Sequence, residues 1–396
     1  MSASKPLDYE SPHKKSAKKF ILKEYIQLTA GPANFSDRVL QALSMQCLNP
    51  LSKEMHLMMD EVKAMLQYLF QTTNPLTLVN QTSGSGGNES ILTNLLDPGD
   101  KLVIAVGGTW GEKVQDMAQR YGFDVLAIRK PPGEIFTVEE LEAAVKSHQA
   151  NLLFVTHGES SGGTLQQLEG IGPMCHKYDC LLAVDAVASM GVDPLYTDRW
   201  QLDAVCTASQ KAIGSPPGLC LLTFSPRAEE RIKAKKNKSP YYFDMTRQGL
   251  YFDCFVDDHS RKYHYTFSSN LLAALREALA QLCEEGLSEV WERHKRNSEY
   301  LWKKMGEIGL DCFVEKVENR FHGITCVKIP SGVDQLELLK FIKDKYDIEI
   351  AYGHGPTLNK AMRIGLLGQN SRPEVVDYLV KALKDGMEQL RKQGTN

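Results

Sequence analysis

Long apolar runs are absent from this sequence of 396 residues. Its most apolar stretches, such as "CLLAVDAVASMGV", are interrupted by a charge and fall short of the roughly 18 residues that span a bilayer. Cysteine is sparse too: the nine residues form no dense framework, which excludes a disulfide scaffold and indicates reduced thiols. The formal net charge of -3 gives no reason to expect nucleic acid or an anionic membrane as a partner.

Targeting signals and metal-ligand clusters are equally scarce. The first 20 residues contain neither an apolar stretch nor an arginine, and the last four, "QGTN", do not match a peroxisomal signal. We therefore expect a cytoplasmic protein, with the peroxisome and the mitochondrion as alternatives. The one grouping of potential ligands, "CHKYDC" at 175–180, lacks the second cluster of a zinc site, so we expect helix packing there and no metal.

Short apolar runs alternate with helical patterns from about residue 75 to residue 224. The runs lack a period of two, as expected of strands covered on both faces, and they read "KLVIAV", "DVLAI", "NLLFV", "CLLAV", "DAVCT" and "LCLLTF". This repetition predicts an α/β fold with a mostly parallel sheet and helices on both sides. After about residue 287 the pattern changes to a smaller α+β unit. We predict an N-terminal arm at 1–24, a large domain at 25–286 and a small C-terminal domain at 287–396.

A loop rich in glycine and serine, "TSGSGGNES", follows the apolar run "LTLV" and precedes a helical segment that ends at Leu96. Its glycines free backbone N–H groups to face an anion, the Ser83 and Ser85 hydroxyls add donors, and the helix adds its positive end. The spacing differs from that of a nucleotide P-loop. We interpret Thr82 to Ser90 as a phosphate-binding loop; a flexible turn is the alternative.

Two ionisable residues follow predicted strands at the edge where ligands bind in open α/β sheets. Asp185 ends "LLAVD", and Lys211 lies 26 positions later, just before a loop broken by glycine and proline. A buried carboxylate usually has a cationic partner. We predict that Asp185 pairs with a protonated pyridine nitrogen and that Lys211 forms a Schiff base, the two contacts that pyridoxal phosphate needs. A structural aspartate with a surface lysine is the alternative.

Two further residues complete a chemically coherent set. Trp110, in "GGTWGE" after a strand, offers a flat face on which a pyridine ring can stack, although a lone tryptophan is more often part of a core. Arg363, in "MRIGLLG", lies in a strand-like run where burying its charge is costly. Its planar guanidinium can bind a carboxylate through two hydrogen bonds; the alternative is a structural ion pair.

The combined motifs resemble a known family. The segments "THGESSGG", "LLAVDAVASMGVDPLYTDRWQLDAVCTASQKAIGSPPGL" and "MRIGLLGQN" are similar to the alanine-glyoxylate and serine-pyruvate aminotransferases, which include the insect 3-hydroxykynurenine transaminases. These are pyridoxal-phosphate enzymes of fold type I, with a large seven-stranded sheet, and the similarity runs from about Leu28 to Leu390. The resemblance implies that Lys211 carries the cofactor and moves the substrate proton, and that Asp185 keeps the pyridine nitrogen protonated.

The resemblance also assigns the remaining contacts. Val187 would pack on the ring face opposite Trp110, and Ser160 would bond near the phenolic oxygen of the cofactor. The phosphate would be held by Ser83, Gly84, Ser85 and Gln210, and by Tyr263 and Thr266 from a second subunit, which predicts a homodimer with shared sites. Arg363 would bind the substrate carboxylate, with Gly31 and Asn49 on the substrate side.

The departures from the family pattern lie on the substrate side. The usual "GPGPSN" is "TAGPAN" at 29–34, "GHMH" is "NPLS" at 49–52, "GSGH" is "TSGS" at 82–85, and "AYGHGP" at 351–356 also differs. We therefore expect an aminotransferase that moves the amino group of a small amino acid, alanine or serine, to glyoxylate or pyruvate by a ping-pong mechanism. The alternatives are a lyase or decarboxylase on the same cofactor, 3-hydroxykynurenine transamination, or a non-catalytic dimeric binding protein.

Overall fold

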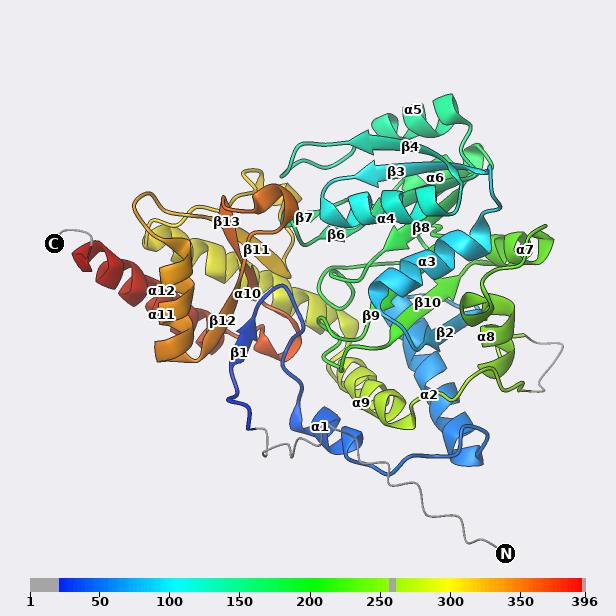
Figure 1. Ribbon diagram of the computed structural model, residues 1–396, viewed down its shortest axis with the longest axis horizontal. Helices are drawn as coiled ribbons and strands as arrows, with labels where there is room; N and C mark the ends of the chain where they lie inside the picture. Colours follow the sequence, from blue (N-terminus) through cyan, green and yellow to red (C-terminus); the bar gives the residue numbers. More distant parts are fainter. Residues whose placement is uncertain (1–20, 256–260, 394–396) are drawn as a thin grey trace, which may run out of the picture.

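The computed structural model describes residues 21–255 and 261–393. Most of the predicted N-terminal arm, residues 1–20, lies outside this range. Two separate sheets organise the chain, a seven-stranded one and a four-stranded one (Figure 1). Within these described ranges, no helix combines the length and the apolar character that crossing a membrane would require.

The seven-stranded sheet forms where the apolar runs predict it. Its strands follow one another in space in the order β2 (Thr77–Asn80), β10 (Cys220–Phe224), β9 (Ala204–Ala208), β8 (Leu181–Asp185), β5 (Leu152–Thr156), β3 (Lys101–Val106) and β4 (Asp124–Arg129). Only β10 runs antiparallel to its neighbours, so the prediction of a mostly parallel sheet is confirmed. The carboxyl ends of β8 and β9 therefore lie side by side.

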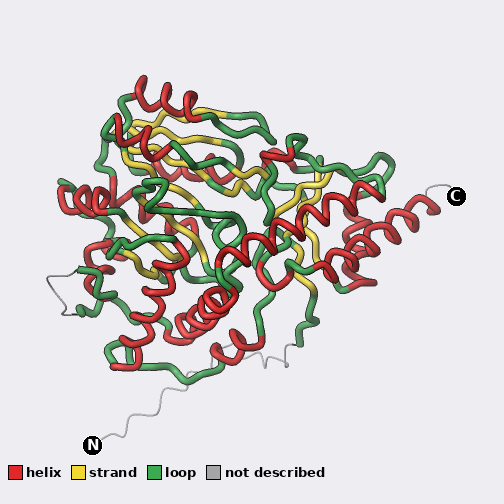
Figure 2. Tube along the Cα trace, turned by 180° about the vertical axis from the view of Figure 1, so that it is seen from behind, coloured by secondary structure: helices red, strands yellow, loops and turns green. Residues whose placement is uncertain are grey.

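Helices cover both sides of this sheet, so its strands are buried on both faces, except for the edge strand β4, which is only partly buried (Figure 2). Those of this part of the chain are α1 (Asp37–Leu43), α2 (Lys53–Phe70), α3 (Gly84–Leu95), α4 (Thr109–Arg120), α5 (Val138–His148), α6 (Ile171–Lys177), α7 (Pro226–Ala234), α8 (Met245–Tyr251) and α9 (Ser269–Glu285), with a short 3₁₀ turn at Tyr241–Phe243. A hairpin of β6 (Gly158–Glu159) and β7 (Thr164–Leu165) follows β5. The continuous apolar character of the strands thus reflects burial on both faces.

The four-stranded sheet has the order β1 (Ile26–Leu28), β12 (Ile348–Tyr352), β13 (Ala361–Gly365) and β11 (Ile324–Lys328). Its helices are α10 (Leu287–Glu307), α11 (Gln335–Tyr346) and α12 (Pro373–Gln393), and 3₁₀ turns lie at Val317–Asn319, Gly355–Thr357 and Gly368–Asn370. β1 comes from the N-terminal part of the chain and pairs in parallel with β12 (Figure 1). The predicted division at residue 287 falls at the start of α10 and stays a prediction.

A close backbone approach joins β13 to the segment that leaves β1. A Cβ atom on Gly365 would overlap the carbonyl oxygen of Thr29 and would lie 3.0 Å from its carbonyl carbon. Since Thr29 precedes Ala30, whose carbonyl group lies in the active site described below, this glycine sets how near the smaller sheet comes to that site. Backbone atoms cannot rotate away as a side chain can, so the position requires glycine.

We expect Gly365→Ala to destabilise the protein by about 1 to 3 kcal/mol, because the added methyl group displaces backbone. Gly306 in α10 is the matched control: a Cβ atom there meets nothing within 4 Å. Gly306→Ala should leave stability unchanged or raise it by up to about 1 kcal/mol, since alanine is the better helix former. Denaturant unfolding of the two variants beside the parent chain measures both effects, and equal stability of the two variants would contradict the expectation.

Candidate active site

A pocket with a cavity volume of about 140 Å³ opens at the carboxyl ends of β8 and β9. Its lining combines elements far apart in the sequence: Ser83, Gly84, Ser85, Asn88, Trp110, Thr156, Gly158, Asp185, Val187, Ala188, Gln210 and Lys211. The predicted phosphate, ring and lysine contacts are thus brought together in one cavity.

The helix at the phosphate end of the pocket begins earlier than the sequence predicts. Residues 82–90 were expected to form a loop, but α3 already starts at Gly84, with Ser83 as its N-cap accepting from the Gly86 N–H at 3.3 Å. Glycine is a poor helix former, yet close packing requires it here, because a Cβ atom on Gly84 would lie 2.7 Å from Cγ2 of Val187. Gly84 and Ser85 line the pocket, and since the first N–H groups of a helix lack helical partners, an anion there can accept from them.

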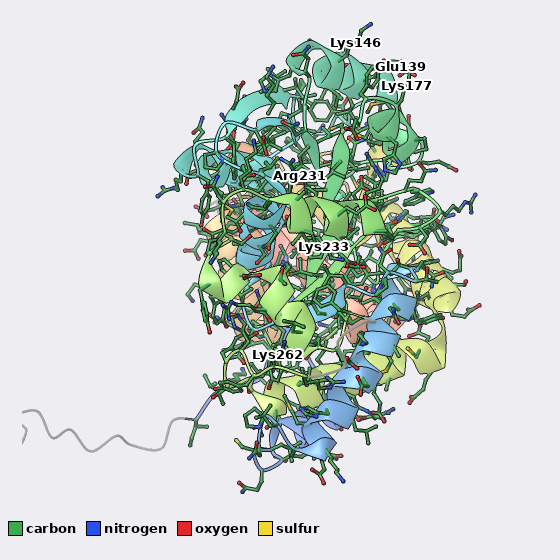
Figure 3. The ribbon with its side chains drawn as sticks, turned by 90° about the vertical axis from the view of Figure 1, so that its right-hand side faces the viewer. Glu139, Lys146, Lys177, Arg231, Lys233 and Lys262 are labelled. Carbon is green, nitrogen blue, oxygen red and sulfur yellow. The ribbon has the colours of Figure 1, made fainter. Side chains whose placement is uncertain are left out.

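The other end of α3 is held by cations from α7. The Arg231 guanidinium donates through Nε to the Leu95 carbonyl at 2.9 Å, and Lys235 donates to the Leu96 carbonyl at 2.6 Å. Positive charges suit the carboxyl end of a helix, where carbonyl groups are left over. Arg231 and Lys233, both labelled in Figure 3, belong to α7. These contacts fix α3 along its axis and therefore fix its anion-binding end.

Asp185 ends β8 with a carboxylate that is 4% exposed. Its Oδ2 accepts from the Asn88 side-chain amide at 2.8 Å, and its Oδ1 accepts from the Val187 N–H at 2.9 Å. Burial raises the pKa of Asp185, while these two hydrogen bonds and the charge of Lys211 oppose the rise. Each carboxylate oxygen keeps room for a further donor, and a cationic N–H in the pocket would satisfy both its charge and its hydrogen-bonding capacity.

Lys211 follows β9 and is 9% exposed. Its Nζ donates to the Ala30 carbonyl, and within the described ranges no carboxylate pairs with it as an ion pair. Burial lowers the pKa of Lys211 to about 8, with Arg363 acting in the same direction and Asp185 against it. An amine with this pKa is uncharged in roughly a tenth of molecules at pH 7, far more often than a lysine with the ordinary pKa, and the uncharged form can act as a nucleophile or a base.

The segment from Ala30 to Ala33 lies directly over the lysine. A Cβ atom on Gly31 would lie 2.5 Å from Cδ of Lys211, and the φ of +98° at this glycine is unfavourable for other residues. The Ala33 N–H also donates to the carbonyl of Gln210 at 3.0 Å. Gly31, predicted on the substrate side, therefore contacts the side chain of Lys211.

Trp110 lies in the first turn of α4 and is anchored by the β6–β7 hairpin. Its indole N–H donates to the Ser160 hydroxyl at 2.7 Å, and its backbone N–H donates to the Glu159 carboxylate at 3.2 Å. Glu159 also accepts from the Ser161 hydroxyl at 2.6 Å. Burial raises the pKa of Glu159 to about 7. The N-cap, Gly108, has no side chain to offer, so Glu159 and Ser161 supply the capping oxygens for this helix.

Arg363 lies on β13 of the smaller sheet and is half-buried. Its Nε donates to the Tyr352 carbonyl at 2.7 Å and its Nη1 to the Ser160 carbonyl at 3.4 Å. In the part of the chain that the structure describes, no carboxylate forms an ion pair with this guanidinium. Burial lowers the pKa of Arg363. The structural ion pair considered as an alternative is therefore not found there, and the cation is available to a ligand.

Six of the predicted residues lie outside the pocket lining: Ser160, Gly31 and Arg363, whose contacts are described above, and Tyr263, Thr266 and Asn49. The Tyr263 and Thr266 hydroxyls bond to each other at 2.6 Å, and Tyr263 is 50% exposed. Asn49 is exposed just before α2. The single chain therefore does not bring Tyr263, Thr266 or Asn49 to this pocket.

Sequence reasoning missed four contributors to this site: Asn88, Glu159, Thr156 and the carbonyl of Ala30. Glu159 lies within a motif singled out for other reasons, and a charged residue directly after a buried run is a usable signal. Asn88 gave no signal, because the Gly/Ser stretch around it was read as a loop and not as a helix facing Asp185. The Ala30 carbonyl is a backbone group, which side-chain motifs cannot indicate.

The residues fit pyridoxal phosphate. Helix-terminal N–H groups and two serines suit the phosphate, a buried carboxylate suits a protonated pyridine nitrogen, and a buried amine with a lowered pKa suits the aldehyde. The Thr156 hydroxyl, which also lines the pocket, has no partner in the described structure. Buried polar atoms are usually satisfied, so a polar ligand is the expected partner.

Comparison with known proteins points the same way. The family model for class-V aminotransferases matches residues 29–379. An alanine–glyoxylate aminotransferase of Rattus norvegicus is 39% identical over 378 residues, which cover 95% of this chain and 91% of the relative.

Solved structures agree with this assignment. The alanine–glyoxylate aminotransferase of Nostoc sp. has a TM-score of 0.92 at 38% identity, covering 96% of this chain and all of its own. The ureidoglycine–glyoxylate aminotransferase of Bacillus subtilis has a TM-score of 0.90 at 28% identity, covering 94% of this chain and 95% of its own. The chain belongs to the class-V aminotransferase family, and it is a pyridoxal-phosphate-dependent aminotransferase of fold type I, as the sequence resemblance predicts.

Proposed function

We propose that this enzyme transfers the amino group of alanine, or of a comparably small amino acid, to glyoxylate by a ping-pong mechanism. The observation that carries the proposal is the half-buried Arg363, free of ion pairs among the described residues, on the smaller sheet beside the pocket of Lys211 and Asp185. Amino acids and oxoacids share an α-carboxylate, so one guanidinium can bind both in turn. The names of the relatives support glyoxylate in particular, because both solved structures are named for glyoxylate, whereas the other substrate is alanine in one name and ureidoglycine in the other.

When bound, pyridoxal phosphate supplies an electron sink that makes the Cα–H bond of the amino acid acidic and stores the amino group between half-reactions. Asp185 keeps this sink effective by holding a negative charge at the floor of the pocket. Lys211 would link to the cofactor aldehyde and, as a free amine, would be the base that holds and moves the proton of the substrate Cα. Its lowered pKa raises the share of the neutral form that this transfer needs.

Arg363 determines which bond of the substrate reacts. By gripping the α-carboxylate on the side of the smaller sheet, the guanidinium turns the Cα–H bond toward Lys211 and keeps the carboxylate bond out of line. Trp110, held by Ser160 and Glu159, bounds the pocket from α4. The departures in the loops at 29–34, 49–52 and 351–356 motivated a lyase or decarboxylase as the alternative, but the relatives support transamination.

Replacing Lys211 tests the proposed chemistry. Lys211→Ala should lower transamination from alanine to glyoxylate by at least about a thousandfold, because the chain loses its base and its covalent anchor. Absorption spectra of the parent protein should change stoichiometrically on adding alanine alone and return on adding pyruvate, and the variant should not respond. Lys384→Ala, at an exposed lysine of α12, is the control and should keep full activity. Product that accumulates well beyond one equivalent per site without any oxoacid acceptor would instead favour the lyase.

Replacing Arg363 tests the carboxylate site. Arg363→Gln should lower kcat/KM for both alanine and glyoxylate by about 10- to 100-fold, because a charge-assisted, two-point contact is lost. Binding of the cofactor should persist, since the Arg363 side chain is absent from the lining of the cofactor pocket. Arg372→Gln, at an exposed arginine after the same strand, is the matched control. Initial rates against each substrate measure the effect, and a loss for one substrate only would contradict a shared site.

We infer that the active form is a homodimer in which Tyr263 and Thr266 reach the phosphate of the other subunit. Support comes from their exposure and from their absence from the pocket of their own chain. Leu51 and Leu57, close in sequence to Asn49, are 51% and 61% exposed, which suits a surface that a second copy covers. The cytoplasm remains the proposed compartment.

Subunit mixing tests this arrangement. In a heterodimer of Lys211→Ala with a Tyr263→Phe, Thr266→Val double variant, one shared site carries both defects and the other carries none. Random pairing of equal amounts makes about half of the dimers heterodimers, each with one intact site, so about a quarter of the parent activity should be recovered. The assay uses limiting cofactor, where each variant alone is poorly active. No recovery would mean that Tyr263 and Thr266 serve their own chain.

A further inference from the structure

A chain of buried side chains joins Asp185 to the neighbouring strand through α3. Asn88, in the second turn of that helix, donates from Nδ2 to Asp185 Oδ2 at 2.8 Å, and its Oδ1 accepts from the Cys206 thiol at 2.8 Å. Cys206 lies on β9 directly opposite Asp185 on β8. Asn88 is 5% exposed and Cys206 is 0% exposed. The three side chains therefore form a sequence of hydrogen bonds shielded from water.

The chemistry of the partners fixes which way the amide points. An ionised carboxylate only accepts hydrogen bonds, so Asn88 must turn its NH₂ group toward Asp185. Its oxygen then faces Cys206, whose thiol is a donor only while it is protonated. Burial raises the pKa of Cys206 well above its ordinary value, and its neighbours Cys220 and Asp185 act in the same direction, so the thiol stays protonated. The hydrogen bonds thus run in one direction: Cys206 donates to Asn88, and Asn88 donates to Asp185.

We propose that Asn88 and Cys206 are positioning residues that hold Asp185 for the pyridine nitrogen of the cofactor. The inference rests on the proposed function and assigns to it two residues that need not touch the cofactor ring. Because Asn88 and the phosphate-binding turn belong to the same helix, α3 sets the distance between the two ends of the cofactor. Removing the amide takes from Asp185 a hydrogen bond that favours its charged form. A carboxyl group that is less often ionised binds a cationic nitrogen less tightly.

The test measures binding of pyridoxal phosphate to purified protein freed of cofactor, together with thermal unfolding of both forms. Asn88→Leu, which keeps the side chain's approximate volume but lacks the donor, should raise the Kd for pyridoxal phosphate by about 10- to 100-fold. Thr93→Val is the matched control: it also removes a hydrogen bond made by a buried side chain of α3, from the Thr93 hydroxyl to the Glu89 carbonyl at 2.7 Å. Its Kd should stay within about twofold of the parent value, because it makes no contact with Asp185.

Cysteine variants keep the inference testable if Asn88→Leu does not fold. Cys206→Ala should raise the Kd by about three- to tenfold, because the amide loses the partner that orients it, and Cys206→Ser should restore binding through its hydroxyl. A merely structural role would lower the unfolding temperature without this rescue.

Unchanged cofactor binding in both Asn88→Leu and Cys206→Ala would overturn the proposal. Failure of the parent protein to react with alanine would instead contradict the proposed function and leave the Kd comparison intact. The two results are therefore distinguishable in the same preparations.

Discussion

Burial of charge at the carboxyl ends of β8 and β9 is the constraint on which the rest of the site depends. Asp185 and Lys211 are both nearly inaccessible to water, and burial raises the pKa of the first and lowers that of the second. A carboxylate in such a place is costly unless donors compensate it. The surrounding structure supplies two, from Asn88 and from the Val187 backbone, and leaves the remaining capacity to the cofactor. The same exclusion of water keeps the amine reactive.

Close approach between elements follows from this constraint. To bring donors and an anion-binding turn to Asp185, α3 must lie directly against the strands, and its glycine residues make that approach possible. Arg231 and Lys235 then hold the far end of the helix. On the opposite side, the hairpin around Glu159 caps α4 and places Trp110, so both helices that face the cofactor are held by contacts outside their own sequence.

The sequence allows much of this to be predicted, but not the parts that depend on tertiary packing. Continuous apolar runs predict the strands of the large sheet because burial on both faces leaves no polar positions. The start of α3 was placed too late, because intrinsic preference argues against a helix at Gly84, and packing against Val187 overrides it. β1 went unrecognised, because three residues carry no pattern and their partner, β12, lies some 320 positions away. The role of Asn88 can be recognised only from the packing of α3, which places its side chain against Asp185.

The path of the chain after β1 links the two sheets mechanically. Ile26 to Leu28 are hydrogen-bonded into the smaller sheet, and within a few residues the same segment supplies the Ala30 carbonyl to Lys211 and the Ala33 N–H to Gln210. Only a few residues separate these contacts. A rotation of the smaller sheet, which carries Arg363, would therefore also move the segment that contacts Lys211. The position of the carboxylate-binding guanidinium and the position of the reactive amine are thus coupled.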